Sequence, residues 1–406
     1  MANLSLKTLV MTVLACGLAA CGTISRPEDG VVRMAAHDWT PAQDPRIRAS
    51  DAASIEILAR DLSGRLASEG PSPAMLALSG GGANGAFGAG VLVGWTQKGD
   101  RPSFAVVTGV STGALAAPFA FLGPDWDEEL EAAYAEGRTQ GLLSWRSLTA
   151  FVAPGLFSPG TLDSLVDEFV TPELLRQIAI EHAKGRRLLI VTTNLDAEET
   201  VIWDMGVLAT QGGEQARSLF RQVLLASASI PGVFPPVLIA GVDEQGRVVQ
   251  EMHVDGGVNT PFLGIPESML LASAPSRAPS NSALYVLVNG QVGRDHRIVR
   301  GALPSILART YDSMSKASLR TSLAANLGYA ERNGIHMYVA AIPDGVQASS
   351  LDFGPDSMKA MFERGRALAA AGNAWSRRDG LAAALAPTPT VAVAAPEAAV
   401  VETPKP

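Results

Sequence analysis

Short apolar runs alternate with segments of helical periodicity through the middle of this sequence. Continuous apolar or β-branched runs predict buried strands, which we place at residues 74–78, 104–108, 188–193, 200–203, 248–254, 283–288 and 335–341. Apolar residues at helical spacing predict helices at residues 54–67, 91–97, 125–136, 214–225, 303–326 and 357–371. This alternation predicts an α/β sandwich with a mostly parallel central sheet.

The two ends of the chain lack this periodicity. Residues 1–20 combine a basic start, a short apolar stretch and small residues, which is typical of a secretory signal peptide. Residues 21–53 contain several prolines and predict a tether, and residues 386–406 consist mostly of Pro, Ala, Val and Thr and predict a disordered tail. Residues 54–385 are left as the predicted catalytic domain.

The junction of the signal peptide and the tether resembles a bacterial lipobox. In Leu18-Ala19-Ala20-Cys21, the resemblance implies that Cys21 is fatty acylated and becomes the first mature residue. Cys16 would leave with the signal, so no internal disulfide could form. Gly22 stands where an Asp would favour the inner membrane, and this favours a lipoprotein of the outer membrane. The alternative is an ordinary signal peptide followed by an incidental cysteine.

Composition narrows the function classes. The 406 residues are 47% hydrophobic and carry a net charge of -8, with no dense cluster of Lys and Arg, which argues against a nucleic-acid partner. The five histidines are scattered, and no group of residues has metal-ligand spacing, so we expect no metal and no cofactor. The irregular apolar segment 140–162 is interpreted as a loop packed on the core, or as a lid over a substrate site.

A Gly-x-Ser-x-Gly turn follows the strand predicted at residues 104–108. Gly109 and Gly113 flank Ser111, and a small-residue helical segment comes next. This order predicts a sharp strand-to-helix turn with an exposed serine hydroxyl near a helix N-terminus. The motif alone is not specific, and the alternative is a turn serine that caps a helix.

A glycine-rich loop, Gly80-Gly81-Gly82-Ala83-Asn84-Gly85, follows the strand predicted at residues 74–78. The spacing fits a dinucleotide fingerprint, but the next strand lacks the acidic residue that such a site needs at its end. Consecutive backbone N–H groups could instead stabilise an oxyanion. Because parallel strands end at one edge of a sheet, this loop and the Ser111 turn are expected to be neighbours.

A third glycine-rich turn, Asp255-Gly256-Gly257, follows the strand predicted at residues 248–254. Together the Gly-Gly-Gly loop, the Gly-x-Ser-x-Gly turn, the Ala-Ser-x-x-Ile-Pro-x-x-Phe-Pro-Pro stretch at 226–236 and this Asp-Gly-Gly turn resemble the patatin-like phospholipase family. The resemblance implies a three-layer α/β/α sandwich. It also implies a lipid acyl hydrolase in which Ser111 is the nucleophile and Asp255 its only partner, and in which Gly80, Gly81 and Gly82 form the oxyanion hole.

The implied chemistry is acyl transfer through an acyl-Ser111 intermediate that water hydrolyses. The substrate would be a lipid or phospholipid ester at a membrane reached through the N-terminal lipid anchor. One position departs from the family pattern, because Asn84 stands where Arg or Lys is usual, and this favours neutral lipids, simple esters or lysolipids over phospholipids.

Two other functions compete with the Ser–Asp interpretation. A triad of Ser111, Asp255 and His296 would match the residue order of α/β-hydrolases, and His296 lies in a loop-like segment. A catalytically silent lipoprotein of the cell envelope is the third possibility, although all the reactive residue types are present.

Overall fold

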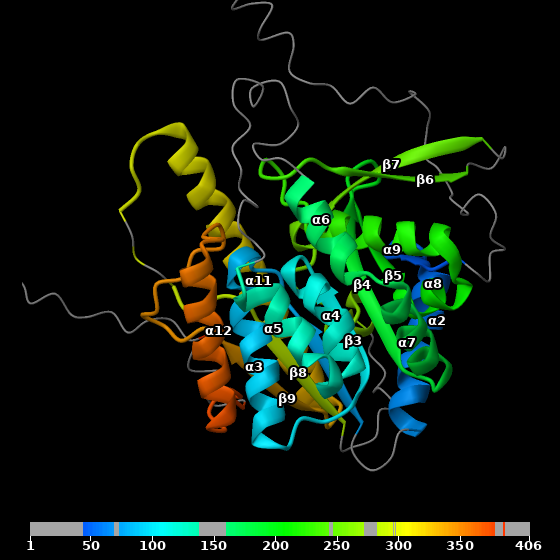
Figure 1. Ribbon diagram of the computed structural model, residues 1–406, viewed down its shortest axis with the longest axis horizontal. Coiled ribbons are helices and arrows are strands. Elements are labelled where there is room, and N and C mark those ends of the chain that lie inside the picture. Colours follow the sequence, from blue (N-terminus) through cyan, green and yellow to red (C-terminus); the bar gives the residue numbers. More distant parts are fainter. Residues whose placement is uncertain are drawn as a thin grey trace, which may run out of the picture.

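A central sheet separates two layers of helices (Figure 1). The structure is a computed structural model that describes residues 44–68, 73–137, 160–242, 247–271, 282–294, 296, 298–377 and 385. Its strands are β1 (Arg46–Arg48), β2 (Ala74–Leu78), β3 (Phe104–Val110), β4 (Arg187–Asn194), β5 (Glu199–Asp204), β6 (Val237–Val242), β7 (Val248–Asp255), β8 (Ala283–Val288) and β9 (His336–Ala341). Its α-helices are α2 (Ala52–Ser68), α3 (Gly85–Lys98), α4 (Thr112–Leu122), α5 (Asp127–Ala135), α6 (Gly160–Phe169), α7 (Pro172–Ala183), α8 (Met205–Gln211), α9 (Gly213–Ser227), α10 (Glu267–Leu271), α11 (Leu303–Arg332) and α12 (Pro355–Ala370).

The strand order is β1-β5-β4-β3-β2-β8-β9, and the central strands from β4 to β9 along this path are parallel. Antiparallel pairs are confined to β1 with β5, β5 with β4, and the hairpin of β6 and β7, of which β7 also pairs with the end of β4. The predicted α/β fold with a mostly parallel sheet is therefore confirmed. Parallel strands bring their carboxyl ends to one edge, and the turns that follow β2 and β3 meet there.

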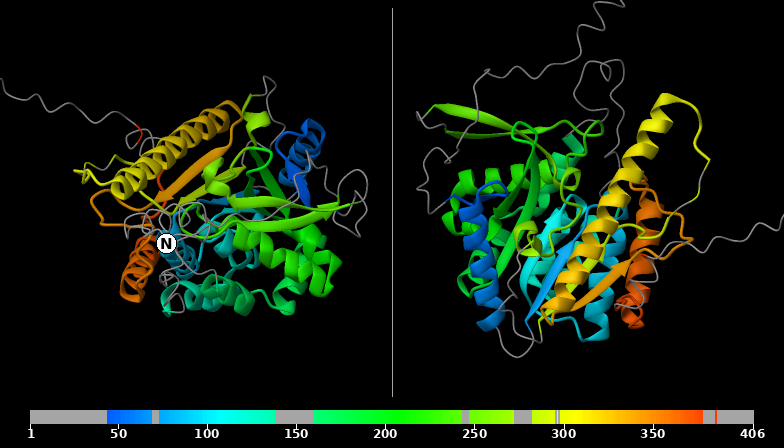
Figure 2. Two further views of the ribbon diagram at one scale, coloured as in Figure 1. Left: turned by 90° about the horizontal axis from the view of Figure 1, so that it is seen from above. Right: turned by 180° about the vertical axis from the view of Figure 1, so that it is seen from behind.

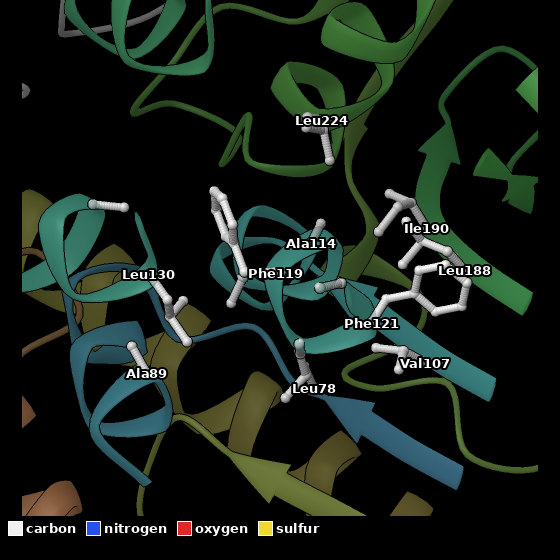
Figure 3. Packing of buried hydrophobic residues seen from close by; sticks show 14 of the residues in the cluster. Leu78, Ala89, Val107, Ala114, Phe119, Phe121, Leu130, Leu188, Ile190 and Leu224 are labelled. Carbon is white, nitrogen blue, oxygen red and sulfur yellow. The ribbon is translucent and has the colours of Figure 1, made fainter. Parts of the chain in front are cut away.

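Side chains on both faces of the sheet are buried, which explains why the strands read as continuous apolar runs. Along β2, Leu76 and Leu78 belong to one core and Met75 and Ala77 to the other. Helices α3, α4, α5, α7, α9 and α12 cover the first core, part of which is drawn in Figure 3. Helices α2 and α11 cover the second core, on the opposite side of the sheet (Figure 2).

The sheet begins earlier in the chain than the sequence predicts. The tether was expected to reach residue 53, but β1 at Arg46–Arg48 pairs with β5 and α2 begins at Ala52, so the sheet starts earlier than predicted. The side chain of Arg48 lies beside Glu199 and Glu251, which gives this short polar strand its place at the edge of the sheet. The remainder of the predicted tether, the signal peptide, Cys21, the tail and most of segment 140–162 lie outside the described residues.

Helix α3 begins at Gly85, six residues before the predicted start. Its glycines have low helix propensity, so the sequence pattern did not predict the first turns of the helix. The packing of α3 against α12 nevertheless requires two of these glycines. A Cβ at Gly90 would lie 1.9 Å from the carbonyl oxygen of Phe362, and one at Gly94 would lie 2.2 Å from that of Arg366. The backbones of α3 and α12 therefore touch, and no larger residue fits between them. No helix among the described residues is both long enough and apolar enough to cross a bilayer.

Candidate active site

The backbone turns sharply at Ser111, between the end of β3 and the first residue of α4. Ser111 has φ 57° and ψ -127°, and residues other than glycine rarely adopt a positive φ. Strain of this kind is worth about 1–3 kcal/mol and persists only where the surrounding structure enforces it. The predicted sharp turn is present, and its serine lies directly before a helix N-terminus. Ser111 was expected to be exposed, but it is only 4% exposed because the surrounding loops and helices cover the turn.

Close approach of the backbone explains the two glycines of the turn. A Cβ at Gly109 would lie 2.6 Å from the carbonyl oxygen of Gly113. A Cβ at Gly113 would lie 2.6 Å from the carbonyl oxygens of both Leu78 and Ser79, at the end of β2. Neither glycine has a positive φ, so it is the lack of a side chain that the turn requires at both positions.

The Ser227 hydroxyl links the Ser111 turn to the neighbouring strand β4. It accepts a hydrogen bond from the N–H of Ser111 at 3.0 Å and donates to the carbonyl of Val191 in β4 at 2.7 Å. Ser227 is fully buried at the end of α9. It belongs to the Ala-Ser-x-x-Ile-Pro stretch noticed in the sequence, but sequence reasoning gave that stretch no role. Its role is to tie the serine turn to the neighbouring strand.

Asp255 lies at the end of β7, opposite Thr192 of β4, and is only 2% exposed. The Ser111 side chain lies close enough to the Asp255 carboxylate to affect its pKa, and the Oδ1 of that carboxylate accepts a hydrogen bond from the N–H of Gly257 at 2.7 Å. Burial raises the pKa of Asp255 to about 7, and these two interactions oppose that rise. The structure thus brings together the two residues that the sequence places 144 positions apart (255 minus 111).

The glycine loop after β2 lies against the Ser111 turn. A Cβ at Gly80 would be 3.2 Å from the Cβ of Ser111. The N–H of Gly80 donates to the carbonyl of Pro261 and that of Ala83 to the carbonyl of Ser350. Gly80 was predicted to supply an oxyanion donor, and the structure corrects this prediction because its N–H is already engaged. Within the described residues, the N–H groups of Gly81 and Gly82 have no acceptor.

Both of these glycines occupy positions that only glycine can fill. A Cβ at Gly81 would lie 2.0 Å from the carbonyl oxygen of Asn289, just after β8. Gly82 has φ +57°, and a Cβ there would lie 2.1 Å from the carbonyl oxygen of Ser350. The loop is therefore fixed from two sides, with its free N–H groups beside the serine.

An apolar cavity adjoins Ser111 and Gly82. Its walls come from α4, α5, α6, α7, α9, α12 and neighbouring loops, and the side chains are Thr112, Leu115, Pro118, Phe119, Ala133, Tyr134, Leu162, Leu165, Val166, Phe169, Val170, Leu174, Leu224, Ala228, Ile230, Phe234, Phe353 and Met358. Helix α6 contributes several of these residues although its first residue lies in the segment that was predicted to be irregular. The lining of this cavity is suited to apolar groups next to the serine hydroxyl.

A second, polar cavity lies behind the glycine loop and shares Met358 with the first. The Asn84 side chain lines it, is 8% exposed, and makes no hydrogen bond within the part of the chain that the structure describes. Arg364 of α12 lines the same cavity, as do Asp344 and Asp352. Arg364 therefore places a positive charge in the cavity that Asn84 lines, and the carboxylates of Asp344 and Asp352 line the same cavity.

No histidine among the described residues forms a hydrogen bond with the pair of Ser111 and Asp255. His296 is exposed, whereas Ser111 and Asp255 are buried. His182 contacts Arg187 and Asp204, and His253 contacts Thr192 and Glu251. Among the described residues no histidine hydrogen bonds to Ser111 or Asp255. The described part of the chain also has no group of three or more His, Cys, Asp and Glu residues that could hold a metal ion.

Comparison with known families supplies an independent observation. Residues 76–264 match the family described as patatin-like phospholipase. This region is a patatin-like phospholipase domain. The match begins in β2, includes Ser111 and Asp255, and ends before β8, α11 and α12. The patatin-like phospholipase family acts on lipid esters, and the domain therefore suggests a hydrolase of that general class.

Other comparisons add little to this assignment. The crystal structure of VipD from Legionella pneumophila is similar over 74% of this chain and 67% of its own, with 11% sequence identity and a TM-score of 0.37. A likeness this weak carries no argument beyond the family match. No curated protein sequence matches the chain.

The strained turn makes a prediction about stability. Replacing Ser111 by Gly relieves the positive φ, whereas Ser111→Ala keeps it, so the glycine variant should be more stable than the alanine variant by about 1 kcal/mol or more. Urea denaturation of the two variants measures the difference. Equal stability, or a more stable alanine variant, would show that the turn is not strained in solution.

Proposed function

We propose that this protein is a serine lipid acyl hydrolase in which Ser111 and Asp255 act as a dyad. The observation that carries the proposal is the proximity of the Ser111 side chain to the buried Asp255 carboxylate, at a strained turn beside an apolar cavity. The family match supports the general class, and the contacts around Ser111 support the finer mechanism.

In the first half of the reaction, the Ser111 Oγ attacks the ester carbonyl carbon while the Asp255 carboxylate accepts the hydroxyl proton. Negative charge develops on the carbonyl oxygen, and the N–H groups of Gly81 and Gly82 are the donors left to bind it. The N-terminus of α4 favours the same charge. When the tetrahedral intermediate collapses, the proton on Asp255 passes to the leaving alcohol and an acyl ester remains on Ser111.

In the second half, Asp255 takes a proton from a water molecule that attacks the carbonyl carbon of the acyl ester. When this second tetrahedral intermediate collapses, the bond to the Ser111 Oγ breaks, the proton passes from Asp255 to that oxygen, and the carboxylic acid is released. A base works best when its pKa lies near the working pH. A pKa of about 7 for Asp255 meets that condition far better than the ordinary value of 3.8. The apolar cavity would hold the acyl chain in both halves of the reaction.

The role of Ser111 as the nucleophile can be tested directly. A fluorophosphonate probe is expected to label the wild-type protein and the His296→Ala variant, but not Ser111→Ala. Asp255→Asn should lose nearly all turnover of a short-chain nitrophenyl ester, because Asp255 is the base that lies beside Ser111 among the described residues. Loss of turnover in His296→Ala with activity retained in Asp255→Asn would support the triad instead. Absence of both labelling and hydrolysis in the wild type would support a silent lipoprotein.

The raised pKa of Asp255 predicts the pH dependence. The carboxylate is the active form, so kcat/KM for a soluble ester should rise with pH through a single ionisation near pH 7 and level off above it. The pH profile of initial rates measures this. A profile that is already flat above pH about 5 would mean that Asp255 ionises like an ordinary carboxyl and would contradict the assignment of the base.

We also propose that Cys21 carries a fatty acyl anchor that holds the protein at the cell envelope, on the outer membrane. The support is the sequence Leu18-Ala19-Ala20-Cys21 with Gly22 after it. The protein produced in a bacterium with its lipoprotein pathway should incorporate labelled palmitate, and Cys21→Ala should not. Equal labelling of both would show that Cys21 is not the acylated residue.

A further inference from the structure

The first half of α11 presents an apolar face to solvent. The exposed fractions of Leu303, Leu307 and Met314 are 67%, 59% and 68%. The face, called the α11 face below, consists of Leu303, Ile306, Leu307, Tyr311 and Met314, and two more exposed apolar residues, Ile298 and Val299, precede the helix. Positions 303, 307, 311 and 314 recur at helical spacing and so lie on one side of the helix. Contiguous apolar surface of this kind marks an interaction site, whereas single exposed residues such as Ile57 do not.

The two halves of α11 have different surroundings. Leu319, Leu323 and Ala330, in the second half, are buried in the core on that side of the sheet. The first turns extend beyond the neighbouring helices, as both Figure 1 and the right-hand view of Figure 2 show. The second half therefore anchors the helix, and the first half has no covering element among the described residues.

The topology places the α11 face at the edge of the sheet that holds Ser111. Strand β8 is parallel to β2 and ends beside the glycine loop, where the Asn289 side chain donates to the carbonyl of Ser79. The chain then leads into α11, which runs back to parallel strand β9. The start of α11 must therefore lie at the same edge as the loop and the serine turn.

Two interactions of α11 agree with this placement. Tyr311 is 44% exposed, burial of the rest of its side chain raises its pKa to about 12, and the Asp255 carboxylate is near enough to be the second cause. Further along the helix, Asn326 accepts a hydrogen bond from the N–H of Ile265, in the segment that follows the Asp255 turn. Tyr311, one residue of the α11 face, thus lies on the side of the proposed dyad.

The charged residues around the α11 face indicate which kind of partner it binds. Arg294 and Arg300 precede the helix, are exposed, and make no ion pair within the described residues, although the whole chain has a net charge of -8. Arg309 lies on the helix and pairs with Asp312, and Lys316 is half-buried. Apolar side chains bordered by basic ones match the interface of a bilayer that contains anionic lipids. A second copy of the chain would bring the same arginines toward each other.

We propose that the α11 face docks the protein on an anionic lipid surface, with its apolar side chains in the interfacial layer and Arg294 and Arg300 on the headgroups. Docking in this orientation turns the Ser111 edge of the sheet toward the lipid, so the proposal rests on the proposed hydrolase function. It concerns a helix outside residues 76–264, the region that the family match covers.

Vesicle binding tests the face in the full-length chain with Cys21→Ala, which removes the proposed anchor. In that background, Leu303→Asp with Leu307→Asp should lower co-sedimentation with phosphatidylcholine–phosphatidylglycerol vesicles by about tenfold or more, because binding scales with buried apolar area. Hydrolysis of the vesicle lipid should fall with it, while turnover of a soluble nitrophenyl ester stays unchanged. Ile57→Asp, an equally exposed apolar position on α2, should bind like the parent. Arg294→Ala with Arg300→Ala should remove the preference for phosphatidylglycerol over pure phosphatidylcholine.

Three results would overturn the proposal. Unchanged vesicle binding by the double Asp variant would exclude the face as the lipid contact. An equal loss of soluble-ester turnover would mean that these residues support the active site itself. A parent that is dimeric by size-exclusion chromatography, and a double variant that is monomeric, would assign the face to a second copy. If the parent hydrolyses no ester but binds vesicles through the face, the hydrolase proposal fails while the docking site stands.

Discussion

The pairing of two buried side chains, Ser111 and Asp255, sets the demands on the rest of the structure. A carboxylate that is 2% exposed is unfavourable unless polar partners compensate for the lost water, and the N–H of Gly257 and the nearby Ser111 side chain are such partners. The backbone that carries the Ser111 side chain adopts a positive φ. That conformation is in turn held by Ser227, which links the turn to β4.

The sheet explains how residues so distant in sequence meet. Ser111 directly follows β3, and Asp255 is the last residue of β7, which pairs with the last residues of β4 in the antiparallel direction. Because β3 and β4 are parallel neighbours, the ends of β3 and β7 lie side by side. The glycine loop comes from β2 on the other side of β3. Three adjacent strand ends thus deliver a hydroxyl, a carboxylate and a pair of free N–H groups to one place.

Local patterns allowed much of the fold and the principal site residues to be predicted from the sequence. The strands at the centre of the sheet are buried on both faces, so their apolar runs are unambiguous, and the turns at Ser111 and Asp255 have glycine signatures. Strand β1 could not be predicted, because three residues that include two arginines form a strand only through their pairing with β5. The start of α3 was missed for a related reason: its glycines are required by the backbone of α12, more than 260 residues away in sequence. The engagement of the Gly80 N–H likewise depends on Pro261, which no local pattern reveals.

The connection from β8 through α11 to the parallel strand β9 also determines which helix borders the candidate active site. A strand that ends at the site edge and a helix that returns to a neighbouring parallel strand must place the helix N-terminus at that edge. Helix α11 makes this return between β8 and β9, and its 30 residues exceed what the six residues of β9 require for cover. The excess length extends past the sheet beside Asp255, and it is there that the apolar side chains occur. An apolar surface at the protruding end of this helix fits the proposed hydrolase, because docking there would bring lipid to the edge of the sheet that holds Ser111. Elsewhere along α11, Leu319 and Leu323 are buried in the core, so the change from buried to exposed apolar positions separates the part of the helix that supports the fold from the part proposed to contact lipid.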